Sequence, residues 1–140
     1  MPSHHFWNPM VPELIVSQFD ESLDFYTSLL GFELRHQRPL PRVAYLDQQG
    51  AQLLLSERHP DSWLSGPLQR PYGRGINLKI ELADIDPLYL RLKAVNYPLF
   101  AELEEHWFDC GQAVLGSREF VLLDPDGYLL RFSQFLGQRS

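Results

Sequence analysis

The chain has a single cysteine, no excess of positive charge and no long apolar run. Cys110 is the only cysteine among 140 residues, so no disulfide can form within the chain. The 12 basic residues are outnumbered by 18 acidic ones and form no run that would neutralise successive phosphates, which argues against nucleic acid as a partner. No apolar stretch approaches the ~20 residues of a membrane span. Residues 1–14 lack the basic and apolar regions of a signal peptide, so we expect a cytoplasmic protein.

What the chain does contain is enough apolar material for one core. Apolar residues make up 44% of the sequence, and no low-complexity tract or shift in composition marks a linker. We therefore expect residues 1–140 to form a single domain. The net charge of -6 favours a cationic or small polar ligand, because such a protein raises the local concentration of cations.

The first half of the chain has the pattern of a strand, a helix and three strands. Residues 11–17 alternate in polarity, which predicts a strand. A helix follows, with Asp20 as its expected N-cap and Gly31 as the residue that ends it. The apolar face of this helix consists of Leu23, Tyr26 and Leu30. The short strands are predicted at 32–38, 43–47 and 51–57.

The second half repeats this order. Asp86 is the expected N-cap of a second helix, 66 positions after Asp20, and Asn96 stands where Gly31 ended the first. The apolar face of this helix consists of Leu88, Leu92 and Val95. The stretch AYLDQQGAQLLLSE at 44–57 aligns with VLLDPDGYLLRFSQ at 121–134, which pairs Leu54 with Arg131. Two βαβββ modules are therefore predicted, at about 10–58 and about 76–136, joined by a loop at 59–75.

Two stretches carry a resemblance to a known family. The segment ELIVSQFDESLDFYTSLLGFEL at 13–34 and the closing REFVLLDPDGYLLRF at 118–132 are similar to the vicinal oxygen chelate superfamily, and REF followed by DPDGYLLRF most resembles its bleomycin resistance branch. The resemblance covers nearly the whole chain. It implies an α+β fold in which two βαβββ modules form a curled mixed β-sheet cup with the helices outside. It also implies a homodimer with the ligand inside the cup.

Metal-dependent members of that superfamily hold an ion with one ligand near the start of each module and one on each module's last strand. The resemblance places these four positions at Val11, Leu54, Asn77 and Arg131. Valine and leucine have no donor atom, and a guanidinium is a permanent cation that repels a divalent ion. We therefore expect no metal and no other cofactor.

Strand alternation predicts which side chains line the cup. If Asn77 and Arg131 face inward, the same parity turns further side chains inward, namely Val11, Glu13, Ile15, Lys79, Glu81 and Ser133. Other residues of these strands would pack beneath the helices: Leu14, Val16, Leu78, Ile80 and Leu82. The charged inner residues Glu13, Lys79, Glu81 and Arg131 allow two interpretations, two ion pairs that brace a wet cleft or direct contacts with a ligand.

Aromatic side chains are the second candidate group, because flat ligands are held by stacking. The candidates are Tyr45, Trp63, Tyr72 and Trp107. Trp63 and Tyr72 belong to the predicted loop at 59–75, and long ordered loops in compact domains are often functional. The alternative for each ring is that it covers a core edge or a dimer interface.

A weaker constellation lies in EEHWFDC at 104–110. The even spacing of Glu104, His106 and Cys110 places them on one face of a strand, but acids beside a histidine are usually a solvated surface. We do not expect a metal or nucleophilic site there.

The function that follows is non-enzymatic binding. We expect a protein that resembles bleomycin resistance proteins and sequesters a cationic, partly aromatic, antibiotic-like ligand in a metal-free cleft. The candidate ligand-binding residues are Glu13, Tyr45, Trp63, Tyr72, Asn77, Lys79, Glu81, Trp107 and Arg131. Two alternatives stay open. One is a glyoxalase-like or dioxygenase-like enzyme with a displaced metal site or a glutamate base, and the other is a metabolite-binding module.

Overall fold

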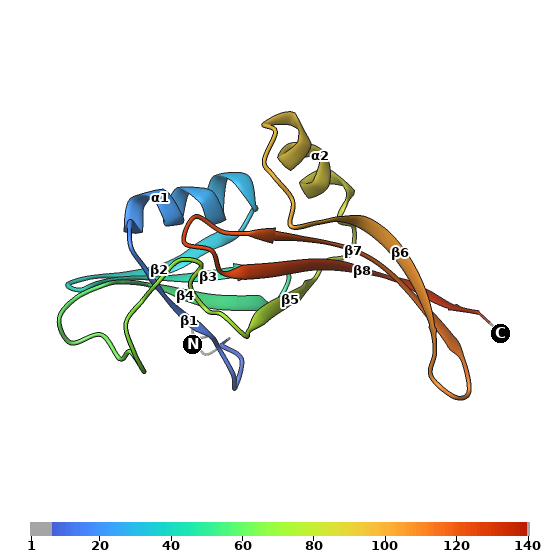
Figure 1. Cartoon of the computed structure of the whole chain (residues 1–140), viewed down its shortest axis with the longest axis horizontal. Coiled ribbons are helices and arrows are strands. Elements are labelled where there is room, and N and C mark those ends of the chain that lie inside the picture. Colours follow the sequence, from blue (N-terminus) through green and yellow to red (C-terminus); the bar gives the residue numbers. More distant parts are fainter. Residues whose placement is uncertain (1–6, 140) are drawn as a thin grey trace, which may run out of the picture. The chain divides into compact units, whose positions relative to one another are not determined.

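The computed structural model describes residues 7–139, which form two compact units with their boundary between Gln69 and Arg70 (Figure 1). Each unit contains one four-stranded sheet and one helical segment. No helix in the described part of the chain is long and apolar enough to cross a membrane.

The sheet of unit 1 is mixed. Its strands are β1 (Glu13–Val16), β2 (Glu33–Pro39), β3 (Arg42–Gln48) and β4 (Ala51–Glu57), in the spatial order β1-β4-β3-β2. β1 runs parallel to β4, and the other neighbours are antiparallel. The helical segment between β1 and β2 consists of α1 (Phe19–Asp24) and the π-helical turn η1 (Phe25–Leu29).

Unit 2 repeats this topology. Its strands are β5 (Asn77–Glu81), β6 (Ala101–Asp109), β7 (Val114–Leu123) and β8 (Leu129–Arg139), in the order β5-β8-β7-β6, and its helix is α2 (Asp86–Ala94). β5 is parallel to β8. The structure therefore confirms the α+β class and the two βαβββ modules predicted from the repeat.

The predicted strand parity is confirmed in both units. Leu14 and Val16 of β1 are buried, as are Ile80 of β5 and Leu82 just beyond it, and they join the apolar core between each sheet and its helix. The alternate residue Glu13 is exposed, and so are Asn77, Lys79 and Glu81. Each sheet thus has one face covered by its helix and one face that carries polar side chains.

The first helix differs from the expected one at its end. The N–H of Leu30 donates to the carbonyl of Phe25, five residues back, at 3.0 Å. This π turn buries the consecutive rings of Phe25 and Tyr26, which lie edge to face at 5.4 Å. Sequence periodicity alone does not reveal this π turn.

Three details of the predicted helices were wrong. The N-caps are Gln18 and Ile85, not Asp20 and Asp86, which lie inside the first helical turns. Val95 is 59% exposed because α2 ends at Ala94, so this valine does not share the buried face.

Both displaced aspartates bind an arginine of the adjoining sheet. Arg42 Nη1 donates to Asp20 Oδ1 at 2.8 Å, and Arg118 Nη2 donates to Asp86 Oδ1 at 2.9 Å. Arg42 also donates to Glu57 through Nε at 3.1 Å and Nη2 at 3.0 Å. The start of each helix is therefore tied to the third strand of its module, which favours one orientation of helix on sheet.

The Arg42 and Glu57 pair predicts a dependence of stability on pH. Hydrogen bonds from Arg42 lower the pKa of Glu57, so the stabilisation is present at neutral pH and is lost as the pH falls through that lowered pKa. We expect Glu57→Gln to lower the urea midpoint near pH 7, and we expect the difference from wild type to shrink as the pH falls below the ordinary pKa of glutamate and through the lowered pKa of Glu57. Urea unfolding followed by circular dichroism across this range measures it. A deficit that persists unchanged in acid would contradict the assigned cause.

Candidate functional site

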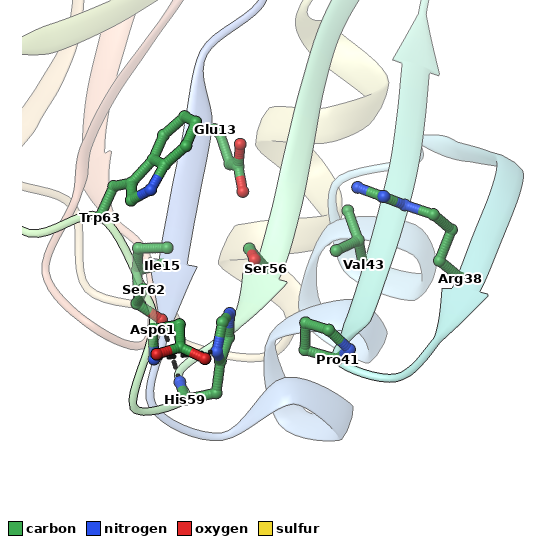
Figure 2. Close-up of a pocket in the computed structure, with 10 residues that line it drawn as sticks. All are labelled: Glu13, Ile15, Arg38, Pro41, Val43, Ser56, His59, Asp61, Ser62 and Trp63. Atoms are coloured by element: carbon green, nitrogen blue, oxygen red, sulfur yellow. Dashed lines mark hydrogen bonds between the residues drawn. The ribbon is translucent and has the colours of Figure 1, made fainter.

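A cavity of about 500 Å³ lies in unit 1, on the sheet face opposite α1 (Figure 2). Its floor is one row of cross-strand neighbours: Ile15 of β1 opposes Ser56 of β4, which opposes Val43 of β3. Arg38 of β2 opposes Val43 and ends the row. The cavity is therefore as wide as the sheet, with β1 at one side and β2 at the other.

The β1 side of the cavity is acidic. Glu13 stands on β1 itself, and Asp61 comes from the loop that follows β4. Among residues 7–139, neither carboxylate has an ion-pair partner. Two unpaired acids at one wall of a hollow attract a cation, and the net charge of -6 adds to this attraction at longer range.

A tight turn fixes the loop beside this wall. The N–H of His59 donates to Ser62 Oγ at 2.9 Å, and the N–H of Ser62 donates to the carbonyl of His59 at 3.0 Å. The N–H of Asp61 donates to Nδ1 of His59 at 3.2 Å, which places the proton of the neutral imidazole on Nε2. The turn therefore sets where Asp61 and the following Trp63 stand.

Trp63 is the most exposed large apolar side chain of the described chain, at 96%. Figure 2 shows its indole on the β1 side of the cavity, near Glu13. Almost none of this indole is covered by other residues of the described chain, and a flat ligand in the cavity would cover one of its faces.

Tyr45 lies on the same sheet face, one row away from the cavity floor, where it opposes Leu54. Its ring meets Trp7 and His36 edge-on, each at 5.3 Å between ring centroids, and the Arg38 guanidinium lies 5.8 Å from its centroid. Tyr45 therefore supports Arg38 at the β2 side of the cavity, and direct ligand contact by Tyr45 stays a prediction.

In unit 2 the corresponding face is closed by an ion pair. Arg131 Nη2 donates to both carboxylate oxygens of Glu119, at 3.2 and 3.1 Å, and its Nη1 donates to Oδ1 of Asn77 at 3.3 Å. Lys79 and Glu81 are exposed beside this group on β5. The partner of Arg131 is Glu119 of β7, a residue that was not among the charged candidates named from the sequence. Among residues 7–139, none of Glu13, Lys79 and Glu81 forms an ion pair.

The two remaining aromatic candidates are packed within unit 2. Tyr72 is 7% exposed and meets Tyr128 edge to face at 5.8 Å. Trp107 of β6 lies against Gly116 of β7, its Nε1 donates to Glu105 at 2.8 Å, and the Arg139 guanidinium lies 4.0 Å from its ring centroid. Trp107 is half-buried, so part of its ring is open to solvent, whereas the ring of Tyr72 is not.

The four positions that the resemblance assigns to metal ligands do not suit an ion. Arg131 and Asn77 bind each other, and the Arg131 guanidinium already neutralises Glu119. Val11 and Leu54 have no donor atom. Within residues 7–139, no group of three or more His, Cys, Asp or Glu side chains is placed to hold a metal. On β6, Nε2 of His106 lies 3.5 Å from Oε2 of Glu104. Cys110 follows the end of this strand, so it is not part of the same strand face.

Sequence reasoning missed several of these residues. Arg38, His59 and Asp61 line the cavity, and Glu119 holds Arg131. A signal for Glu119 is present in the strand parity, because it shares a face with Val121, which opposes Arg131. No sequence signal places Asp61 in the same cavity as Glu13, since its position depends on the path of the loop after β4.

The chain resembles known proteins over most of its length. Residues 4–132 match the family described as Glyoxalase/Bleomycin resistance protein/Dioxygenase superfamily. A bleomycin resistance protein of Geobacillus stearothermophilus is 28% identical over 134 residues, which cover 89% of this chain and 94% of that protein. The crystal structure of a glyoxalase/bleomycin resistance protein/dioxygenase from Alicyclobacillus acidocaldarius is 26% identical, covers 91% of this chain and 92% of that one, and has a TM-score of 0.58. TioX from Micromonospora sp. ML1 has a TM-score of 0.69 at 20% identity, over 92% of this chain and 100% of that one, and shares the fold.

Proposed function

The chain belongs to the Glyoxalase/Bleomycin resistance protein/Dioxygenase superfamily, and from this premise we propose that it binds a cationic, partly aromatic small molecule and does not alter it. The similarity to bleomycin resistance proteins supports an antibiotic-like ligand. Sequestration in the cytoplasm requires tight binding and no turnover, and nothing in the proposed site has to act as a nucleophile or a base.

The observation that carries this proposal is the acidic side of the cavity in unit 1. Glu13 and Asp61 offer two unpaired carboxylates to a cation, and the exposed indole of Trp63 stands beside them. A cation that approaches an indole face is attracted by the ring quadrupole, and an aromatic part of the ligand can stack on the same ring. The cavity volume of about 500 Å³ is within the ordinary range for small-molecule sites.

The polar face of unit 2 belongs to the same proposal. We assign Asn77, Lys79, Glu81 and Arg131, together with the half-buried Trp107, to ligand contacts on this face of unit 2. We also propose that two chains form a homodimer. The exposed rings of Phe108 on β6 and Phe135 on β8 are candidates for the contact between the chains.

The test is a calorimetric titration with metal-free bleomycin at low and moderate salt. We expect saturable binding near one ligand per chain that weakens as salt rises, because the attraction is partly electrostatic. Glu13→Gln combined with Asp61→Asn should weaken binding about tenfold or more, since contacts between charged groups contribute on the order of 1 kcal/mol each at exposed sites. Trp63→Ala should weaken it several-fold.

The matched control is Glu21→Gln combined with Glu33→Gln. Both residues are exposed and lie outside the cavity, so this variant changes the net charge equally. An equal loss of affinity in both double variants would show only a long-range charge effect and would contradict a site at Glu13 and Asp61. Absence of saturable binding to wild type would remove bleomycin-like ligands from the proposal.

A further inference from the structure

The cavity of unit 1 is acidic at one side and basic at the other. Glu13 and Asp61 lie on the β1 side, and Arg38 rises from β2, the opposite edge strand of the sheet. Figure 2 shows the Arg38 side chain turned back over β3, so that its guanidinium lies above Val43 and faces the interior of the cavity. The cavity therefore offers a cation site and an anion site to one ligand.

Arg38 has no carboxylate partner among the described residues. Within residues 7–139 its guanidinium makes no hydrogen bond and no ion pair, and its ring contact with Tyr45 at 5.8 Å leaves the N–H donors available. Arg42, four residues later, differs sharply, because it binds Asp20 and Glu57 together. A planar guanidinium with unused donors inside a cavity fits a carboxylate or another oxyanion, which it can bind through two parallel hydrogen bonds.

The sheet sets the distance between the two charges. β1 and β2 are the outer strands of four, so their backbones are three strand spacings apart, about 14 Å. The side chains that reach inward over the sheet bring the two charges closer together than the two backbones. Between them lie the methyl groups of Ile15 and Val43 and the hydroxyl of Ser56. This floor suits a flat apolar segment better than a polar chain.

We propose that the ligand of this cavity is dipolar, with a cationic group held at the side of Glu13 and Asp61 and an oxyanion held by Arg38, at opposite ends of a flat aromatic segment. This inference rests on the proposed function and narrows it. A ligand that carries only positive charge would leave Arg38 unpaired and would be repelled by it. Arg38 is thus the residue that selects for the second charge.

The experiment compares two probes of equal shape. One is 4′-(aminomethyl)biphenyl-4-carboxylate, which carries an ammonium and a carboxylate at opposite ends, and the other is its methyl ester, which keeps only the ammonium. In wild type we expect the carboxylate to bind about tenfold more tightly by calorimetry, as expected for one charge-assisted contact. In Arg38→Gln the two probes should bind equally, with the ester unchanged or slightly improved.

Arg58→Gln is the matched control. Arg58 is exposed, follows β4 directly and does not line the cavity. Its substitution removes the same charge nearby and should preserve the tenfold preference for the carboxylate probe. Equal binding of both probes to wild type, or a preference that survives Arg38→Gln, would overturn the dipolar assignment while the cation site stands. If neither probe binds wild type, the proposed cation site at Glu13 and Asp61 fails together with this inference.

Discussion

Gly127→Ala is expected to destabilise unit 2 by about 2–5 kcal/mol, through backbone strain and steric overlap together. Gly127 has φ +97°, a conformation that a side chain strains by about 1–2 kcal/mol. A Cβ built there would lie 2.5 Å from Cβ and 2.6 Å from Cα of Pro71, and the backbone cannot move away without disturbing the buried Tyr72. Overpacking of this kind adds about 1–3 kcal/mol.

Its control lies at the equivalent turn of the first module. Gly50 has φ +89°, but a Cβ there would meet nothing within 4 Å. Gly50→Ala should therefore lower the free energy of unfolding only through backbone strain, by about 1 kcal/mol. Urea unfolding of both variants, followed by circular dichroism, separates the two contributions. If the two losses were equal, the close approach of Pro71 to Gly127 would not hold in solution.

Arg131→Glu combined with Asn77→His should create a zinc site beside Glu119. Arg131 and Asn77 already touch each other beside Glu119, so the two substitutions bring an imidazole and a second carboxylate next to an existing one. Without metal, the variant should be less stable than wild type, because two carboxylates then face each other. Zinc at about 100 times its dissociation constant should raise the free energy of unfolding of the variant by about 2.7 kcal/mol. Thermal unfolding with and without zinc measures the effect.

The control for this design is Arg131→Gln combined with Asn77→His. It removes the guanidinium and adds the imidazole but brings no new carboxylate, so its response to zinc should be much weaker. Wild type should not respond. If the Arg131→Glu, Asn77→His variant shows no gain in thermal stability with zinc, positions 77 and 131 do not form a metal site. In that case the interpretation of Arg131 as a replaced metal ligand would be wrong.

The two modules have the same sheet topology, but different side chains cover the polar face of each sheet. In unit 2, Glu119 and Arg131 form an ion pair across β7 and β8. At the equivalent register positions of unit 1 stand Val43 and Leu54, which make no such bridge. Val43 forms part of the cavity floor, and the loop after β4 adds a wall to the cavity. This difference explains why the acidic cavity forms on the first module.

The repeat was readable from sequence because it depends on local patterns. Alternating polarity, the helical apolar faces and the turn glycines at Gly31, Gly50 and Gly127 are each set by a few neighbouring residues. The N-cap predictions failed for a non-local reason. Asp20 and Asp86 are suitable caps by residue type, but Arg42 and Arg118 on the adjoining sheets bind their carboxylates instead.

The candidate site was only partly readable. Parity predicted that Glu13 and Arg131 lie on the polar faces of their sheets, and the structure agrees. Side-chain partners were not predictable, because Arg131 meets Glu119 through the antiparallel register of β7 and β8. The positions of Arg38 and Asp61 depend on a hairpin and on a loop turn, whose geometry no periodic pattern encodes.

The sequence by itself determined the α+β class, the two βαβββ modules and the face to which each strand residue turns, because these follow from residue type and period along the chain. Only the tertiary structure decided that Glu13, Asp61, Trp63 and Arg38 share one cavity, and that Glu119 neutralises Arg131. Both outcomes depend on strand register and loop path. Those are set by the packing of segments far apart in sequence, so they cannot be read from neighbouring residues.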